Sequence, residues 1–269
     1  MRSFFYYKEH LIIVTELLRQ NLFEFGKFIT DNDEVPYFTM TRLCYITRQT
    51  LIALNFIHNL GLIHSDIKPE NILIASYSRA RVKLIDFGSS CFFTDRQSSY
   101  IQSRSYRAPE VILGLPYDGK IDMWSLGCVV AEMFTGQVTF QNRSVVSMLS
   151  RIEAICGPFP KHIYMNGKQS SNYFTPNGLI YERIGKNKAN DEEDDELSDD
   201  YDEEETNASI QEEIERSGED WFKIYTPKMT TLAERLGFDA DLMERPRDNL
   251  EVSLFHFNFN NSRSFYTTC

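Results

Sequence analysis

The clearest pattern along the chain is a helical repeat of apolar residues between positions 41 and 60. Five apolar side chains recur there at helical spacing: Leu43, Ile46, Leu51, Leu54 and Ile57. Thr39 or Thr41 can cap the start, and Gly61 follows the end. The pattern therefore predicts one long amphipathic helix that places this stripe on a core.

Other segments give shorter signals. The β-branched run at residues 10–18 predicts a buried strand, and the apolar runs at 72–75 and 82–85 predict a hairpin. Residues 122–135 are apolar on nearly all sides, which predicts a helix buried at the centre of a domain. Residues 144–155 predict a further amphipathic helix.

The last third of the chain is less clear. Residues 209–216 and 229–237 predict short helices, and the phenylalanines at alternate positions in 254–259 are strand-like. Residues 191–205 hold twelve carboxylates and no cation, so they cannot bury themselves and predict a disordered loop. Ser198 among these acids is a candidate site for an acidophilic kinase; a solvated loop is the simpler interpretation.

Charge and composition exclude several functional classes. The net charge of −11 comes from the acidic run, and the remaining 27 acidic residues nearly balance 28 basic ones, so no nucleic-acid partner is expected. The five scattered cysteines fit reduced thiols, and no stretch approaches the roughly 20 apolar residues that a membrane span needs. We expect a protein of the cytoplasm and/or nucleus.

Three short motifs carry the chemistry. Residues 64–71 read HSDIKPEN after the long helix, Asp86-Phe87-Gly88 follows the second strand of the hairpin, and Ala108-Pro109-Glu110 comes later. Their order and spacing resemble the catalytic loop, the magnesium loop and the end of the activation segment of eukaryotic protein kinases. The resemblance implies an α+β, protein kinase-like fold, mainly the helical large lobe with only the last small-lobe strands.

The kinase resemblance explains why these residue types are present. Asp66 would accept the proton of the acceptor hydroxyl, and Lys68 would neutralise charge on the transferring phosphoryl group. Asn71 and Asp86 offer hard oxygen ligands from adjacent loops, which suits Mg²⁺ bridging the phosphates of ATP. Gly88 would let the loop that carries Asp86 turn sharply. The alternative for each Asp is an exposed turn carboxylate.

The resemblance narrows within the kinases. Residues 100–114, YIQSRSYRAPEVILG, resemble the activation segment of the dual-specificity tyrosine-regulated (DYRK) family, and Ser65 replaces the usual arginine as in that family. The family's Y-x-Y pair reads S-S-Y here. The resemblance implies autophosphorylation of Tyr100, with Arg104 and Arg107 binding the phosphate. The alternative is a tyrosine that packs in the loop.

The same resemblance supplies a nucleotide site. Thr15 falls at the gatekeeper position, and the backbone of Glu16, Leu17 and Leu18 at the hinge would bond adenine. Leu73 would form the apolar floor under adenine, with ordinary core packing as the alternative. Asp122 is expected to anchor the backbone of the catalytic loop, and His64 to support that loop rather than act as an acid or base.

The expected organisation has four parts. Residues 1–18 would be a remnant of the small lobe and hinge, and 19–165 the large lobe with the catalytic loop and activation segment. Residues 166–237 would be a kinase-group insert with a disordered acidic loop at about 186–208, followed by an atypical tail at 238–269. A Gly-rich phosphate loop is absent before residue 10, and the tail lacks the arginine expected to pair with Glu110.

Two functional hypotheses follow. The first is a serine/threonine kinase with tyrosine autophosphorylation that uses ATP and Mg²⁺ on protein substrates, represented by a fragment with little activity of its own. The second is a non-catalytic, kinase-like protein that binds substrates or regulators. A coding sequence upstream with a Gly-rich loop would favour the enzyme.

Overall fold

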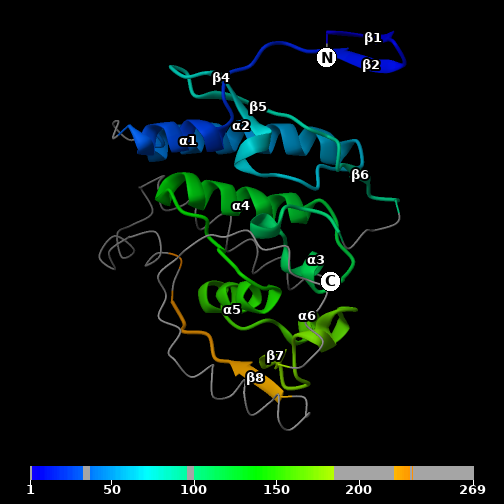
Figure 1. The fold of residues 1–269 in the computed structure, drawn as a ribbon, viewed down its shortest axis with the longest axis vertical. Coiled ribbons are helices and arrows are strands. Elements are labelled where there is room, and N and C mark those ends of the chain that lie inside the picture. Colours follow the sequence, from blue (N-terminus) through cyan, green and yellow to red (C-terminus); the bar gives the residue numbers. More distant parts are fainter. Residues whose placement is uncertain (1, 33–36, 96–99, 185–220, 231, 233–269) are drawn as a thin grey trace.

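The computed structural model describes residues 2–32, 37–95, 100–184, 221–230 and 232, and shows a mixed α+β fold (Figure 1). The helices are α1 (Leu22–Asp31), α2 (Met40–Asn59), α3 (Pro109–Ile112), α4 (Lys120–Thr135), α5 (Val145–Cys156) and α6 (Lys161–Asn166). The strands are β1 (Ser3–Tyr7), β2 (His10–Val14), β3 (Leu62–Ile63), β4 (Ile72–Ser76), β5 (Arg81–Leu84), β6 (Cys91–Phe92), β7 (Ile180–Ile184) and β8 (Trp221–Tyr225). Short 3₁₀ turns are η1 (Pro69–Asn71), η2 (Arg104–Tyr106) and η3 (Ser170–Asn172).

The long helix α2 confirms the helical repeat. Thr39 caps its start by accepting a hydrogen bond from the backbone N–H of Arg42, and Gly61 follows its end with φ +77°. The buried stripe includes Leu43, Ile46, Leu54 and Ile57. Burial of this stripe holds α2 against the rest of the fold.

Helix α4 lies between α2 and α5, as Figure 1 shows, and confirms the prediction of a buried central helix. Most of its residues from Ile121 to Glu132 are buried, and Gly136 ends it in the left-handed conformation at φ +74°. Helix α5 starts with a reciprocal capping box between Ser144 and Ser147. The prediction of a helix at residues 144–155 is therefore confirmed.

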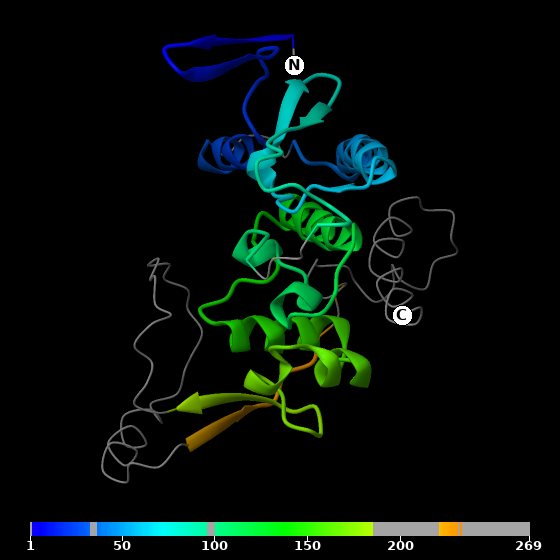
Figure 2. The ribbon, with the colours of Figure 1, turned by 90° about the vertical axis from the view of Figure 1, so that its right-hand side faces the viewer.

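The predicted hairpin is also confirmed by the antiparallel pair β4–β5. It stands between α1 and α2 in Figure 2. Gln49 of α2 fixes it, because its Nε2 donates to the carbonyl of Ala80 at 2.9 Å while its Oε1 accepts from the N–H of Val82 at 3.2 Å. Ile72 and Ile74 of β4 are buried, and Leu73 between them faces the other way and is partly exposed.

The sequence predicted a buried strand at residues 10–18. A strand is present, but the prediction that it is buried is wrong. Strand β2 covers only His10–Val14 and pairs with β1 alone among the described residues. Both faces of this two-stranded sheet are exposed; Ile13 is 56% exposed. A β-branched run predicts the strand but not what covers it, and no described helix packs on this hairpin.

Several sequence predictions fall outside the described residues: the acidic loop, the helix at 209–216, most of the helix at 229–237 and the whole tail from 238. No helix within the described ranges is long and apolar enough to cross a membrane.

Candidate active site

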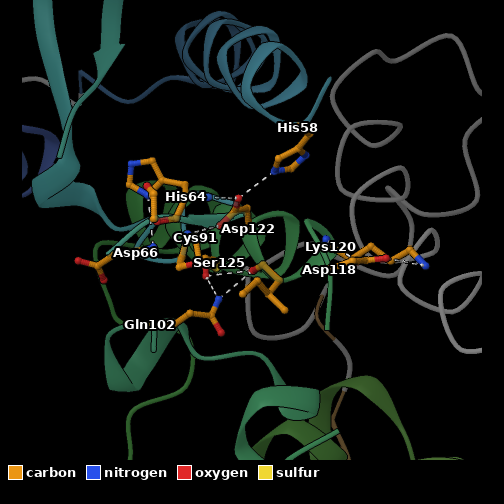
Figure 3. A network of polar contacts seen from close by, with 12 residues as sticks. His58, His64, Asp66, Cys91, Gln102, Asp118, Lys120, Asp122 and Ser125 are labelled. Carbon is orange, nitrogen blue, oxygen red and sulfur yellow. Dashed lines mark hydrogen bonds and ion pairs between the residues drawn. The ribbon is translucent and has the colours of Figure 1, made fainter. Parts of the chain in front are cut away.

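Asp122, at the start of α4, anchors the backbone of the catalytic loop (Figure 3). Its Oδ2 accepts the backbone N–H of His64 and its Oδ1 that of Ser65, both at 2.9 Å. His58 of α2 adds a contact from Nε2 to Oδ2 at 2.8 Å. Asp122 is fully buried, and three donors among the described residues satisfy its two oxygens. The prediction that Asp122 anchors the loop is confirmed.

The ring of His64 joins the catalytic loop to the strand end before Asp86. Its Nδ1 accepts the N–H of Asp66 at 3.3 Å, so Nε2 carries the proton and donates to the carbonyl of Ile85 at 3.0 Å. The residue is fully buried. Both ring nitrogens are therefore engaged in holding backbone, which fits the expected supporting role.

Three polar residues meet at Asp66. Lys68 places Nζ 3.0 Å from Oδ2, and Asn71 donates from Nδ2 to the backbone carbonyl of Asp66 at 2.8 Å and to Oδ2 at 3.2 Å. Ser103, from the activation segment, donates to Oδ1 from its hydroxyl at 2.8 Å and from its N–H at 3.2 Å. Lys68 also donates to the Ser103 hydroxyl at 3.1 Å. The carboxylate is thus surrounded by donors.

These donors decide the charge of Asp66. Partial burial acts to raise its pKa, but the hydrogen bonds from Lys68 and Ser103 outweigh burial and the pKa lies below its usual value. Asp66 is therefore ionised at neutral pH and able to accept a hydrogen bond or a proton.

Asp86 lies next to the catalytic loop, as the sequence predicts for a pair of ligand-bearing loops. The N–H of Ile85 donates to the carbonyl of Asn71 at 2.9 Å, which joins the two loops directly. The side chain of Asp86 is exposed. The Nδ2 of Asn71 donates hydrogen bonds to Asp66, so the Oδ1 of Asn71 is the atom that can bind a cation. An amide oxygen and a carboxylate are hard ligands that fit Mg²⁺.

The expectation about Gly88 needs correction. The left-handed residue of this turn is Asp86, at φ +63°, and Gly88 is not among the residues with positive φ. Asp86 tolerates this conformation because its Oδ1 accepts the N–H of Gly88 at 3.0 Å. A Cβ on Gly88 would lie 3.0 Å from that same oxygen, so the glycine supplies room rather than backbone freedom.

Gln102 fastens the activation segment to α4 (Figure 3), a role that no sequence pattern predicts. Its Nε2 donates to the carbonyl of Ile121 and to Oγ of Ser125, and its Oε1 accepts the N–H of Ala108. Its own N–H donates to the carbonyl of Ser65 at 3.0 Å. Gln102 has φ +64° and is buried. A single glutamine among polar residues gives no periodic signal, so no pattern could have identified it.

Of the predicted regulatory residues, the structure brings Arg107 to Tyr100. The guanidinium lies 5.7 Å from the ring centroid, and it donates to the carbonyls of Ile101 and Gln102 at 2.9 Å each. Tyr100 is 87% exposed, and Arg104 is exposed in turn η2. The ring of Tyr100 is therefore accessible beside a fixed arginine.

The predicted nucleotide residues lie on two neighbouring segments. Arg19 donates its N–H to the carbonyl of Ile74 at 2.8 Å, and Ile74 donates back to Gln20 at 2.9 Å, so the segment after Leu18 runs alongside β4 and Leu73. The side chain of Glu16 forms an ion pair with Lys83, and this hydrogen bond lowers its pKa. The side chain of Leu17 is fully exposed. The expected hinge and the expected floor are thus adjacent.

Glu110 lacks an ion pair within the part of the chain that the structure describes. Burial raises its pKa to about 7. The expectation that the tail from residue 238 supplies no arginine for Glu110 falls outside the described residues.

Comparison with known families agrees with this geometry. A family described as protein kinase domain matches residues 1–191, which is more than half of the chain. The loop around Asp66, its anchor on Asp122 and the neighbouring Asp86 all lie within that match. The chain therefore belongs to the protein kinase family.

The more specific resemblance is confirmed by curated relatives. The chain is 39% identical over 197 residues to the human dual specificity tyrosine-phosphorylation-regulated kinase 4, covering 72% of this chain and 37% of that protein. It is 40% identical over 174 residues to a probable dual specificity kinase, a YAK1 homolog, of Encephalitozoon cuniculi, covering 65% and 42%. It is 44% identical over 158 residues to the DYRK-family kinase pom1 of Schizosaccharomyces pombe, covering 59% and 14%. The chain spans less than half the length of these relatives.

Proposed function

We propose that this protein is a serine/threonine kinase of dual specificity that transfers the γ-phosphate of ATP to hydroxyl groups of proteins. The observation that carries the proposal is the contact between Ser103 and Asp66. An alcohol hydroxyl already donates to Oδ1 of the ionised carboxylate at 2.8 Å, which is the contact that an acceptor serine or threonine needs. Asp66 is then the base that accepts the proton of the acceptor as phosphate is transferred.

The neighbouring residues have matching roles. Lys68, 3.0 Å from Asp66, supplies positive charge beside the transferring phosphoryl group. Oδ1 of Asn71 and the carboxylate of Asp86 would hold Mg²⁺, which neutralises phosphate charge when bound. The backbone of Glu16 and Leu18 with the exposed side of Leu73 would receive adenine.

Tyr100 adds a second acceptor within the chain itself. Its exposure makes the hydroxyl accessible, and Arg107 beside its ring, with Arg104 in the next turn, would bind the phosphate after transfer. Autophosphorylation at Tyr100 would then order the activation segment that also carries Ser103.

A non-catalytic binding role is the second candidate. The exposed faces of β1–β2 favour it, since Tyr6 is 72% and Ile13 56% exposed.

The deciding experiment is phosphate transfer from radiolabelled ATP to a generic protein substrate. It is measured on the endogenous protein, immunoprecipitated with an antibody to this chain, and on tagged variants from the same cells. We expect Asp66→Asn to lower the rate by about 10²-fold or more with unchanged abundance. Asp31→Asn, an exposed carboxylate at the end of α1, serves as the control. Equal rates in wild type and Asp66→Asn would overturn the proposal and favour the binding role.

A further inference from the structure

An ion pair joins the segment after β2 to the β4–β5 hairpin, outside the group of side chains around Asp66. It forms between the carboxylate of Glu16 and Nζ of Lys83, whose side chains are 41% and 48% exposed. Glu16 lies in the expected hinge, whose backbone would bond adenine. Lys83 lies in β5, shortly before Asp86, and the proposed phosphate transfer assigns no role to its side chain.

Lys83 stands next to Leu73 on the exposed face of the hairpin. In the antiparallel register of β4 and β5, Leu73 is directly opposite Lys83. Opposite residues in such a pair point to the same face, with Cβ atoms about 5 Å apart. Ile72, Ile74 and Val82 point to the other face and are buried. The side chain of Lys83 and the expected floor under adenine therefore belong to one surface.

Few contacts hold the expected hinge against this surface. Within the described part of the chain, the pair between Glu16 and Lys83 is the one hydrogen bond or ion pair from residues 15–18 to the hairpin. The next contacts are the two backbone hydrogen bonds of Ile74, which lie beyond residue 18, where the blue chain between β2 and α1 in Figure 1 passes β4. The position of the hinge relative to Leu73 therefore depends on this pair.

We propose that Lys83 is a positioning residue for ATP, which holds the hinge at a fixed distance from Leu73 through its ion pair with Glu16. The inference rests on the proposed function, because it concerns the nucleotide of the same reaction. Adenine that enters between the hinge backbone and Leu73 meets a preformed slot, so less binding energy is lost in ordering residues 15–18. Lys83 acts through Glu16 and touches neither the nucleotide nor the reacting atoms.

The competing explanation is a surface ion pair without a function. Exposed pairs contribute little to stability, so a stability measurement does not separate the two explanations. Breaking a surface pair would leave the KM for ATP unchanged, whereas breaking a positioning pair would raise this KM and leave kcat nearly unchanged. A third explanation, in which the cation of Lys83 attracts the phosphates directly, predicts an effect on ATP and none on adenosine, which carries no phosphate.

Arg81 provides a matched control. It lies on the same strand as Lys83 and on the same face, where it is exposed. It forms no ion pair with an acidic side chain of the described residues. Arg81→Met therefore removes a cation from this surface and leaves the contact with Glu16 in place.

The test measures the KM for ATP, kcat and the inhibition constant of adenosine in the radiolabelled transfer assay, on tagged protein immunoprecipitated from cells. The variants are Lys83→Met, Glu16→Gln, the conservative Lys83→Arg, and the double variant Glu16→Lys/Lys83→Glu, in which the two charges are exchanged. Immunoblots give the amount of each variant, so that kcat is compared at equal protein.

We expect Lys83→Met and Glu16→Gln each to raise the KM for ATP and the inhibition constant of adenosine by about threefold to fivefold. Their kcat should stay within about twofold of the wild type. Lys83→Arg and the double variant should return both constants toward the wild-type values, and Arg81→Met should change neither.

Three outcomes would contradict this inference. Transfer by the wild type with an unchanged KM for ATP in Lys83→Met would overturn it and leave the proposed function intact. A raised KM for ATP with an unchanged inhibition constant of adenosine would also overturn it, because the lysine would then act on the phosphates. Absence of transfer by the wild type would overturn both proposals.

Discussion

Ser103 and Lys68 hold the two oxygens of one carboxylate. The hydroxyl of Ser103 donates to Oδ1 of Asp66 at 2.8 Å, and Nζ of Lys68 lies 3.0 Å from Oδ2. Ser103 belongs to the activation segment and Asp66 to the catalytic loop. The hydrogen bond from Ser103 lowers the pKa of Asp66, so a movement of the activation segment that removes Ser103 would change this pKa. The pKa of Asp66 is thereby coupled to the conformation of the activation segment.

Replacement of Ser103 by alanine tests this coupling. Ser103→Ala removes the hydroxyl donor to Asp66, so the pKa of Asp66 should rise toward its usual value. As the pH is lowered, activity that requires ionised Asp66 should then begin to fall at a higher pH in Ser103→Ala than in the wild type. The pH dependence of kcat/KM measures the shift.

Ser105→Ala is the control for this experiment, because Ser105 lies in turn η2, two residues after Ser103, and is not among the described donors to the carboxylate of Asp66. An acid limb at the same pH in Ser103→Ala and wild type would show that Ser103 does not set the pKa.

The anchor at Asp122 predicts a large effect on stability. Asp122→Asn keeps the shape but replaces one charged acceptor oxygen by an amide donor, which faces the N–H of His64 or Ser65. Loss of one hydrogen bond to a charged group and an unfavourable donor pair should lower the free energy of unfolding by roughly 3 kcal/mol.

Urea denaturation followed by tryptophan fluorescence measures this difference. Asp31→Asn, exposed at the end of α1, should change the free energy of unfolding by less than about 0.5 kcal/mol. Equal effects of the two substitutions would contradict the anchoring role.

Glu132 predicts how stability depends on pH. It is buried in α4, and burial raises its pKa to about 7 although Tyr106 donates to its Oε2 at 2.7 Å. In the unfolded chain its pKa returns to the ordinary value near 4.5. Between these values the folded carboxyl keeps a proton that the unfolded one has lost, so its contribution to stability decreases as pH rises from about 4.5 to about 7.

Chemical denaturation at pH 5.5 and pH 7.5 measures this effect. Glu132→Gln should make the free energy of unfolding less dependent on pH over this interval, because the titrating group is gone. Glu110, whose pKa is also raised to about 7, should leave a remaining dependence of the same sign. A variant with an unchanged pH dependence would contradict the assignment to Glu132.

The sequence predicted those helices in which an apolar repeat coincides with residues that favour the start or the end of a helix. Helix α2 has both an apolar repeat and end signals, a cap at Thr39 and a glycine at Gly61. Helix α4 is apolar on nearly all sides and ends at Gly136. Helix α1 was not predicted, although Leu22, Phe25 and Ile29 recur in it at helical spacing. Its cap, Asn21 accepting the N–H of Glu24, is a local signal that could have marked it.

The site shows the same division. Asp66, Lys68, Asn71 and Asp86 were identified because motif order alone places them in adjacent loops. Ser103 and Gln102 were not, because their contacts with Asp66 and α4 join residues far apart in the sequence. Long-range polar contacts have no period, so only the folded chain shows them.

The contact between Tyr100 and Arg107 predicts that a phosphate on Tyr100 is protected from hydrolysis by a phosphatase. Arg107 is held by the carbonyls of Ile101 and Gln102, so its position does not depend on modification of Tyr100. A phosphate on Tyr100 would pair with this fixed cation and be shielded from a phosphatase. Arg107→Lys keeps the charge but loses the planar fork, so phosphotyrosine should be hydrolysed severalfold faster.

Phosphatase time courses on the tyrosine-phosphorylated protein, read with a phosphotyrosine antibody, measure this rate. Arg143→Lys outside the activation segment is the control and should match the wild type, while Tyr100→Phe should remove the signal. If Arg107→Lys loses phosphate no faster than Arg143→Lys, the phosphate does not lie on Arg107, and the regulatory role of the pair is wrong. If Arg107→Lys loses phosphate faster, then phosphorylation of Tyr100 stabilises the activation segment, which also places Ser103 against Asp66.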